Sequence, residues 1–288
     1  MVSVVMPAGI EKYLQRTIDE ILEKAEGDVE VIVHLDGVWP DPPINDDPRV
    51  ILIHSGKQRG MRAGINSCAA IARGKYLMKL DAHCALDKGF DTKLKADCER
   101  DWLVVPQRYS LKEDTWKPDR PRAVQQYIRP PYKKPERARW WDAGMGGKDW
   151  RGYKPESDLF DLMSFQGSCY FMHLDYFREL GGLDDSVWGI FTKEAQEIGV
   201  KVWLSGGRCV RNMRTWYAHW HKGKDNHRGY FLNRDELQRG ELGNVDMWMN
   251  NKWPKQKHDF KWLIDKFSPV PEWENFNWET KEHAVKNP

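Results

Sequence analysis

Residues 76–85 read YLMKLDAHCA, and this stretch decides the fold because an apolar run ends in a carboxylate and an imidazole two positions apart. The run follows Gly74, a residue that interrupts regular structure, and therefore predicts a short strand over residues 76–80. Side chains alternate between the two faces of a strand, so Asp81 and His83 point the same way and can share a metal ion. The alternative interpretation is a strand end where Asp81 only caps the next turn and His83 is an ordinary polar residue.

Strands and helices alternate through the first hundred residues around this stretch. The apolar spacing predicts strands at 2–6, 29–34 and 50–54 and helices at 13–24, 65–71 and 90–98. Strand followed by helix and strand is the pattern of a parallel sheet, so we expect a doubly wound α/β fold. Such a sheet binds its ligand in a crevice at the carboxyl ends of the strands. Pro7, Asp36 and Asp81 lie at such ends, where we expect a nucleotide.

The composition is that of a folded globule. The chain has 288 residues, 40% hydrophobic and 12% aromatic, which excludes global disorder. Its five cysteines are odd in number and form no C-x-x-C pair, so neither a disulfide framework nor a zinc knuckle is indicated. The N-terminus enters a strand without a charged leader, and no run of about 18 apolar residues occurs. We therefore expect a cytoplasmic protein without membrane insertion.

Residues 116–141 form a basic and aromatic segment, WKPDRPRAVQQYIRPPYKKPERARWW, with eight basic residues against two acidic ones. The whole chain carries a net charge of only +2, so positive charge is concentrated here. A concentrated basic, aromatic segment is a candidate surface for an anionic partner. The alternative is a solvated loop that packs its rings on the domain.

The second half returns to regular structure. Residues 165–185 predict a strand, a helix and a glycine-bounded turn, and residues 192–207, TKEAQEIGVKVWLSGG, predict a helix and then a strand. Residues 259–267 predict one amphipathic helix, followed by a tail.

Four stretches carry a resemblance to a known family. Residues 2–22, 29–37, 60–85 and 167–221 resemble the family 2 glycosyltransferases of GT-A fold, and the second half is most similar to the polypeptide N-acetylgalactosaminyltransferases. The resemblance implies a central, mostly parallel sheet flanked by helices and a UDP-sugar as donor. It places Pro7, Ala8 and Glu11 at the nucleotide-binding strand, Asp36 on the uracil and Arg62 on the nucleotide.

The same resemblance implies a metal site made of Asp81, His83 and His219. His221 stands two residues on and remains an alternative third ligand on an alternating segment. A divalent ion would stabilise the charge that grows on the departing diphosphate. Mixed carboxylate and imidazole ligands suit Mn²⁺ best and Mg²⁺ second.

The acceptor side departs from the pattern of the family it resembles. Extra residues stand between Gly189 and Glu194, and Ala195 replaces the expected asparagine, so the transferred sugar stays open. In a retaining reaction, Glu194 would position hydroxyl groups beside a catalytic Asp81. In an inverting reaction it would be the general base, and the bland alternative is an exposed helix glutamate. Lys222 and Arg228 could close over the diphosphate.

Domain boundaries and acceptor are the remaining expectations. We expect a glycosyltransferase domain over 1–222, divided into a nucleotide-binding half (1–107), a basic aromatic insert (110–160) and an acceptor and metal half (161–222), with a helical extension at 223–288. The favoured acceptor is a 5-hydroxymethylpyrimidine in DNA, as for a phage-encoded enzyme. The alternatives are a glycan or protein acceptor, and a non-catalytic module that binds a nucleotide sugar or nucleic acid.

Overall fold

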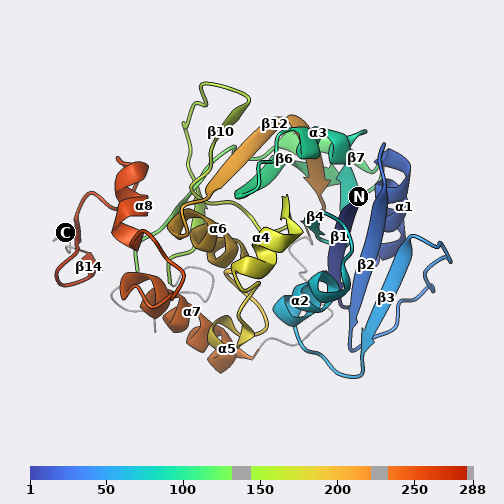
Figure 1. Cartoon of the computed structure of the whole chain (residues 1–288), viewed down its shortest axis with the longest axis horizontal. Helices are drawn as coiled ribbons and strands as arrows, with labels where there is room; N and C mark the ends of the chain where they lie inside the picture. The colour runs from blue at the N-terminus through green and yellow to red at the C-terminus, as the bar shows by residue number, and fades with distance from the viewer. Residues whose placement is uncertain (132–143, 222–232, 284–288) are drawn as a thin grey trace.

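The computed structural model describes residues 1–131, 144–221 and 233–283 of the chain. Its centre is a ten-stranded sheet with the order β10-β12-β6-β11-β4-β1-β2-β3, with β5 on β12 and β7 on β6 (Figure 1). The strands of this sheet are β1 (Val2–Ala8), β2 (Val29–Asp36), β3 (Val50–Ser55), β4 (Tyr76–Leu80), β5 (Cys84–Leu86), β6 (Trp102–Lys112), β7 (Lys117–Pro121), β10 (Leu159–Asp161), β11 (Cys169–His173) and β12 (Arg208–His219). Two small hairpins add β8 (Gln126–Ile128), β9 (Gly147–Asp149), β13 (Phe276–Asn277) and β14 (Glu282–His283).

The sheet runs mostly parallel, as the sequence predicts. β4, β1, β2 and β3 are parallel neighbours, and so are β6 and β12, whereas β11 runs antiparallel between β4 and β6. From β1 the chain adds β2 and β3 on one side of the sheet, and it then returns to add β4 on the other side of β1. A parallel sheet opens a crevice at such a reversal, beyond the carboxyl ends of its strands.

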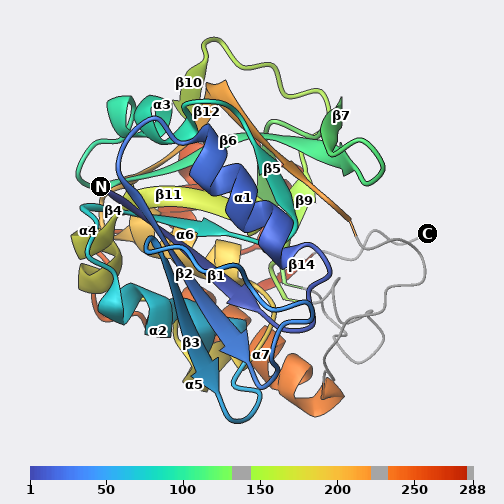
Figure 2. The ribbon, with the colours of Figure 1, turned by 90° about the vertical axis from the view of Figure 1, so that its right-hand side faces the viewer.

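Helices cover both faces of the sheet. The helices are α1 (Leu14–Lys24), α2 (Met61–Ile71), α3 (Phe90–Ala96), α4 (Leu174–Glu179), α5 (Asp185–Trp188), α6 (Glu194–Leu204), α7 (Arg234–Met249) and α8 (Phe260–Lys266). α1 and α3 lie on one side, and α2, α5 and α7 lie on the other, in both views (Figure 1, Figure 2). Adjacent residues of β1, Val4 and Val5, are fully buried in the two separate cores that result.

The second half of the chain differs from the sequence prediction in two elements. α6 continues through Leu204, and the strand that we expect inside residues 192–207 begins only at Arg208, after Gly206 and Gly207. Almost every residue of α6 is buried, so its apolar run has no polar face that would indicate a helix. The sequence reading also misses α7, whose polar sequence carries little apolar periodicity.

The described part of the basic segment contains strands. β7, with the sequence KPDRP, pairs with β6 and is exposed along its whole length. β8 pairs with β9. Residues 132–141 of this segment, including Tyr132, Lys133, Lys134, Trp140 and Trp141, lie outside the described residues.

All five cysteines lie in the described chain, and each is buried with a free thiol. Burial raises the pKa of the Cys68 and Cys98 thiols to about 12. Among the helices that the structure describes, none has the length and apolar character needed to cross a membrane.

Candidate functional site

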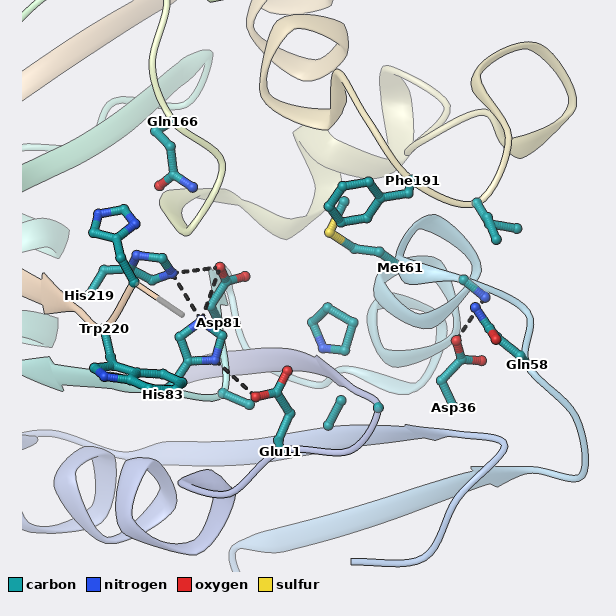
Figure 3. A pocket seen from close by; sticks show the side chains of 17 residues that line it. Glu11, Asp36, Gln58, Met61, Asp81, His83, Gln166, Phe191, His219 and Trp220 are labelled. Carbon is teal, nitrogen blue, oxygen red and sulfur yellow. Dashed lines mark hydrogen bonds and ion pairs between the residues drawn. The ribbon is translucent and has the colours of Figure 1, made fainter. Parts of the chain in front are cut away.

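A cavity of about 280 Å³ opens where the carboxyl ends of β1 and β4 meet. Seven of the residues that the sequence analysis assigns to the nucleotide or the metal line it: Pro7, Ala8, Glu11, Asp36, Asp81, His83 and His219. Gln58, Gly60, Met61, Gln166, Ile190, Phe191, Trp220 and His221 complete much of its wall. The cavity therefore joins the two ends of the expected donor site, with Asp36 at one end and the histidines at the other (Figure 3).

Asp81, His83 and His219 converge at one end of this cavity (Figure 3). The Nε2 atoms of His83 and His219 are 3.0 Å apart, and His219 Nε2 lies 3.1 Å from Asp81 Oδ2. Bonds of about 2.1 Å to an octahedral ion place neighbouring ligand atoms about 3.0 Å apart. The donor set and its spacing therefore fit one divalent ion. His219 completes this group, whereas His221 stays outside it.

The fold explains why these three side chains meet. Asp81 follows β4 directly, and His83 lies two residues later in the bend between β4 and β5, so the fold of this bend and not strand alternation places its side chain. His219 is the last residue of β12, where it pairs with Cys84 of β5. The pairing of the short strand β5 with β12 therefore holds the end of β12 beside residues 81–83. This link spans 136 residues of sequence between the two histidines.

Glu11 orients His83 from the other side of the ring. Its Oε2 atom lies 3.0 Å from His83 Nδ1, which fixes the Nδ1–H tautomer and leaves the Nε2 lone pair facing Asp81 and His219. Carboxylates behind metal-binding histidines often have this role. Burial holds the pKa of His219 down to about 3, so this imidazole is neutral at ordinary pH.

A buried lysine controls the charge of Asp81. Lys79 Nζ lies 2.6 Å from Asp81 Oδ1 and 3.0 Å from Glu194 Oε1. Burial alone would lower the pKa of Lys79, but the two carboxylates outweigh it and raise the pKa. Burial would likewise raise the pKa of Asp81, but Lys79 and the two histidines hold it well below its usual range. Asp81 is therefore an anion, with Oδ1 taken by Lys79 and Oδ2 turned to the histidines.

Glu194 lies behind the cavity and not on its wall. Its side chain is buried, contacts Lys79, and packs so closely against Gly167 that a Cβ there would come within 2.7 Å of its Oε2. Burial raises the pKa of the Glu194 carboxyl, with Lys79 acting in the opposite sense. The alternative of an exposed helix glutamate is wrong, and a direct contact with the acceptor is not part of this arrangement.

Asp36 lies at the end of the cavity away from the histidines. Its carboxylate accepts the backbone N–H groups of Arg59 at 2.6 Å and of Gly60 at 2.9 Å, just before α2 (Figure 3). Asp36 therefore fixes the loop that forms this end of the cavity, and it still lines the cavity itself.

Arg62 does not reach the cavity, in contrast to the nucleotide contact that the resemblance implies. Its side chain is fully buried, its Nε lies 2.9 Å from Glu197 Oε2, and it donates to the carbonyl oxygens of Gly189 and Thr192. Because these partners take the guanidinium, Arg62 holds the segment between α5 and α6 instead of a ligand.

This segment, residues 189–193, supplies an apolar wall that the sequence analysis does not assign. Ile190 and Phe191 line the cavity with Met61, whose N–H bonds the carbonyl oxygen of Ile190 at 3.0 Å (Figure 3). The backbone is left-handed at Thr192 and Lys193, with φ of 85° and 53°. The extra residues between Gly189 and Glu194 indicate an altered site in the sequence, but the length of this insertion alone does not predict that it lines the cavity.

Lys222 and Arg228, assigned to the diphosphate, lie outside the described residues.

Comparisons with known proteins agree with this fold. The family model described as glycosyl transferase family 2 matches residues 3–159, more than half of the chain. No curated protein matches the sequence.

Solved structures are similar over most of the chain. A crystal structure of GalNAc-T7 with UDP, GalNAc and Mn²⁺ has a TM-score of 0.65 and 18% identity, and covers 87% of this chain and 49% of that one. TarS residues 1–349 from S. aureus with UDP-GlcNAc has a TM-score of 0.53 and 11% identity, with 91% and 69% covered. The chain thus spans about half the length of GalNAc-T7, and the likeness confirms the GT-A fold.

Proposed function

The chain belongs to glycosyl transferase family 2, and from this we propose that it is a metal-dependent glycosyltransferase that moves a sugar from a UDP-sugar to an acceptor hydroxyl. The observation that carries the proposal is the convergence of Asp81, His83 and His219 inside the cavity at the strand ends. GalNAc-T7 was crystallised with UDP, GalNAc and Mn²⁺, and TarS with UDP-GlcNAc, which supports a UDP-sugar as donor.

The residues of the cavity divide the task. Asp81, His83 and His219 hold a divalent ion, Mn²⁺ or Mg²⁺, which when bound supplies positive charge to the leaving diphosphate. Glu11 keeps His83 in the tautomer that binds. Pro7 and Ala8 form the floor under the nucleotide, and Asp36 receives the uracil at the far end, for which its place in the cavity and the loop it fixes give support.

We propose a retaining course for the transfer. An inverting reaction needs a base at the acceptor hydroxyl. Glu194 is the base suggested by the sequence, but it is buried against Lys79 and does not line the cavity. A retaining reaction, in which the acceptor hydroxyl lies beside the departing phosphate, does not require it. NMR of the product measures the anomeric configuration, and an inverted product would contradict this course.

A 5-hydroxymethylpyrimidine in DNA is the acceptor that we favour. Its support is the exposed strand β7, where Lys117 and Arg120 extend beside the equally exposed Arg122. Phosphate contacts make affinity fall steeply with salt, whereas a neutral glycan or a protein acceptor responds weakly. Binding of duplex DNA measured over a series of salt concentrations therefore separates these acceptors.

The donor is tested first. The protein is incubated with Mn²⁺ and a panel of UDP-sugars, and slow release of UDP without acceptor identifies the sugar. Chelation of the metal and the variant Asp81→Asn should both remove the release. If no UDP-sugar is hydrolysed or transferred with any acceptor, the non-catalytic binding module becomes the better interpretation.

A further inference from the structure

Arg108 of β6 is a buried cation that the proposed function does not use. It is 7% exposed, and within the described chain its guanidinium has no hydrogen-bond or ion-pair partner; its nitrogens are not among the buried atoms without a partner, so they keep some contact with solvent. Other buried cations of this part of the chain are paired: Lys79 with Asp81 and Glu194, and Arg62 with Glu197. A charge with little solvent contact and no protein partner is costly, and the cost is offset when a ligand of opposite charge arrives.

The sheet places Arg108 on the face of the metal site. Arg108 pairs with Tyr217, and two residues later Ser110 pairs with His219 in the parallel register of β6 and β12. Residues two apart share a face, so Arg108 lies on the same face as His219. One strand spacing and two residue rises put the two Cα atoms roughly 8 Å apart, within reach of a long guanidinium side chain.

Positive charge accumulates around Arg108. The backbone N–H of Arg122 donates to the carbonyl oxygen of Arg108 at 2.9 Å, which brings these two arginines together. The Arg122 side chain is exposed and has no ion-pair partner among the described residues. His219, which lies on the same face two residues beyond the partner of Arg108, lines the cavity, although neither arginine does. The arginine pair therefore lies beside the histidine end of the cavity.

We propose that Arg108 and Arg122 bind a phosphate group at the edge of the cavity next to His219. Two adjacent guanidinium groups match the charge and the several acceptor oxygens of a phosphate better than those of one carboxylate. The phosphate has two sources, the diphosphate of the UDP-sugar and a phosphodiester of the acceptor. The identity of the phosphate ligand rests on the proposed function. The location of the site rests on Arg108, which has no partner among the described residues.

A stability measurement separates this role from a structural one. Arg108→Met keeps much of the side-chain volume and removes the unpaired charge, so the variant should unfold at the same temperature as the parent or higher. A guanidinium that held the fold together would give the opposite result. Inorganic phosphate should raise the unfolding temperature of the parent, and this gain should be lost in Arg108→Met.

The source of the phosphate is read from two binding titrations, with UDP and Mn²⁺ and with a short DNA duplex. Arg108→Met should weaken the binding of one of these two ligands by about tenfold or more. Arg108→Lys, which keeps the charge but lacks the planar guanidinium, should weaken it by less. A loss with UDP assigns the diphosphate, and a loss with DNA alone assigns the acceptor. The control is Arg239→Met, an exposed arginine of α7, which should change neither.

Three results would decide against the site. Phosphate protection unchanged in Arg108→Met, unchanged affinity for both ligands, or a strongly destabilised Arg108→Met and Arg108→Lys each overturn the proposal. If the parent fails to bind UDP with Mn²⁺ but phosphate protection depends on Arg108, the phosphate site stands and the proposed glycosyltransferase function fails. The two inferences are thus tested separately.

Discussion

The imidazoles of His83 and His219 face each other with their Nε2 atoms 3.0 Å apart, and Asp81 Oδ2 is the nearest anion to that meeting point. Nε2 atoms in this arrangement, when they carry lone pairs, form a stable arrangement once a cation lies between them.

Replacing a residue of this group should remove the activity and leave the fold. Asp81→Asn and His83→Ala are each expected to lower UDP-sugar turnover at least about 100-fold, because a direct ligand contributes more than the groups behind it. Mn²⁺ titrations and UDP release measure the effect, and the control is His258→Ala near α8. Near-normal turnover of either variant in the presence of chelator would rule out the metal site.

Glu11→Gln tests the orientation of His83. The carboxamide can still accept the Nδ1–H bond but lacks the negative charge, so the affinity for Mn²⁺ should fall about 10-fold to 100-fold. Calorimetric titration with Mn²⁺ measures this change, and Glu23→Gln, an exposed glutamate paired with Lys24, serves as the matched control. Equal affinities in Glu11→Gln and the control would show that Glu11 does not act through His83.

Asp36→Ala should affect donor binding more than chemistry. A contact with the uracil is the same in the ground state and the transition state, so its loss raises the donor KM and leaves kcat nearly unchanged. The variant also removes the hydrogen bonds from the N–H groups of Arg59 and Gly60. The loop at that end of the cavity then becomes less ordered, which should raise the donor KM further. A parallel fall of kcat would instead place Asp36 in the chemical step.

Arg62→Leu should destabilise the fold by about 3 kcal/mol, because it leaves the buried Glu197 short of a partner. Lys201, 2.7 Å from Glu197, limits the loss. Adding Glu197→Leu should recover part of the stability in urea unfolding. Arg100→Leu, which breaks an exposed pair with Glu179, should cost less than about 1 kcal/mol. Equal costs for the two single variants would show that the Arg62 network is not structural.

The contribution of Glu241 to the stability should fall as the pH rises through the acid side of neutrality. Burial raises the pKa of the Glu241 carboxyl from 4.5 to about 7, although Lys193 lies 3.1 Å away and acts in the opposite sense. Between these two values the folded chain holds a proton that the unfolded chain has released. The Glu241 contribution to the free energy of unfolding therefore decreases with pH, by roughly 3 kcal/mol in total, whereas the lowered pKa of His219 contributes in the opposite sense.

Glu241→Gln removes this titration and keeps an acceptor for Lys193. Urea unfolding from pH 4.5 to 8 should show that the free energy of unfolding of the parent, minus that of this variant, decreases as the pH rises. Glu274→Gln, at an exposed site, is the control. A variant with the same slope as the parent would assign the pH dependence to other groups.

The strands of the first half could be predicted because their signals are local. β4 has the predicted bounds, but Asp81 and His83 follow it in a bend, so they come together for another reason than the strand alternation on which the prediction rested. The choice of His219 over His221 depended on a resemblance and stays a prediction; in the structure His219, the last residue of β12 and the partner of Cys84 in β5, is the one that lies with Asp81 and His83.

The remaining features depend on long-range pairing that no local pattern contains. Arg62 meets Glu197 across 135 residues, so its place at the start of a helix could not show that it is buried. In the sequence, Lys79 is likewise a single polar residue in an apolar strand. Its contact with Glu194 forms only when the chain is folded. α7 escapes prediction for a different reason, because its sequence is polar on most sides.

The burial of all five thiols makes the protein suitable for spectroscopic labelling without prior cysteine replacement. Maleimides react with accessible thiolates, and the native sulfhydryl groups are neither accessible nor readily ionised. Arg120→Cys on β7 would therefore carry a fluorophore at one defined position near the cationic edge of the cavity. A second label at Arg239→Cys on α7 would give a distance pair for energy transfer, through which substrate-driven movements of the two surfaces could be followed in solution.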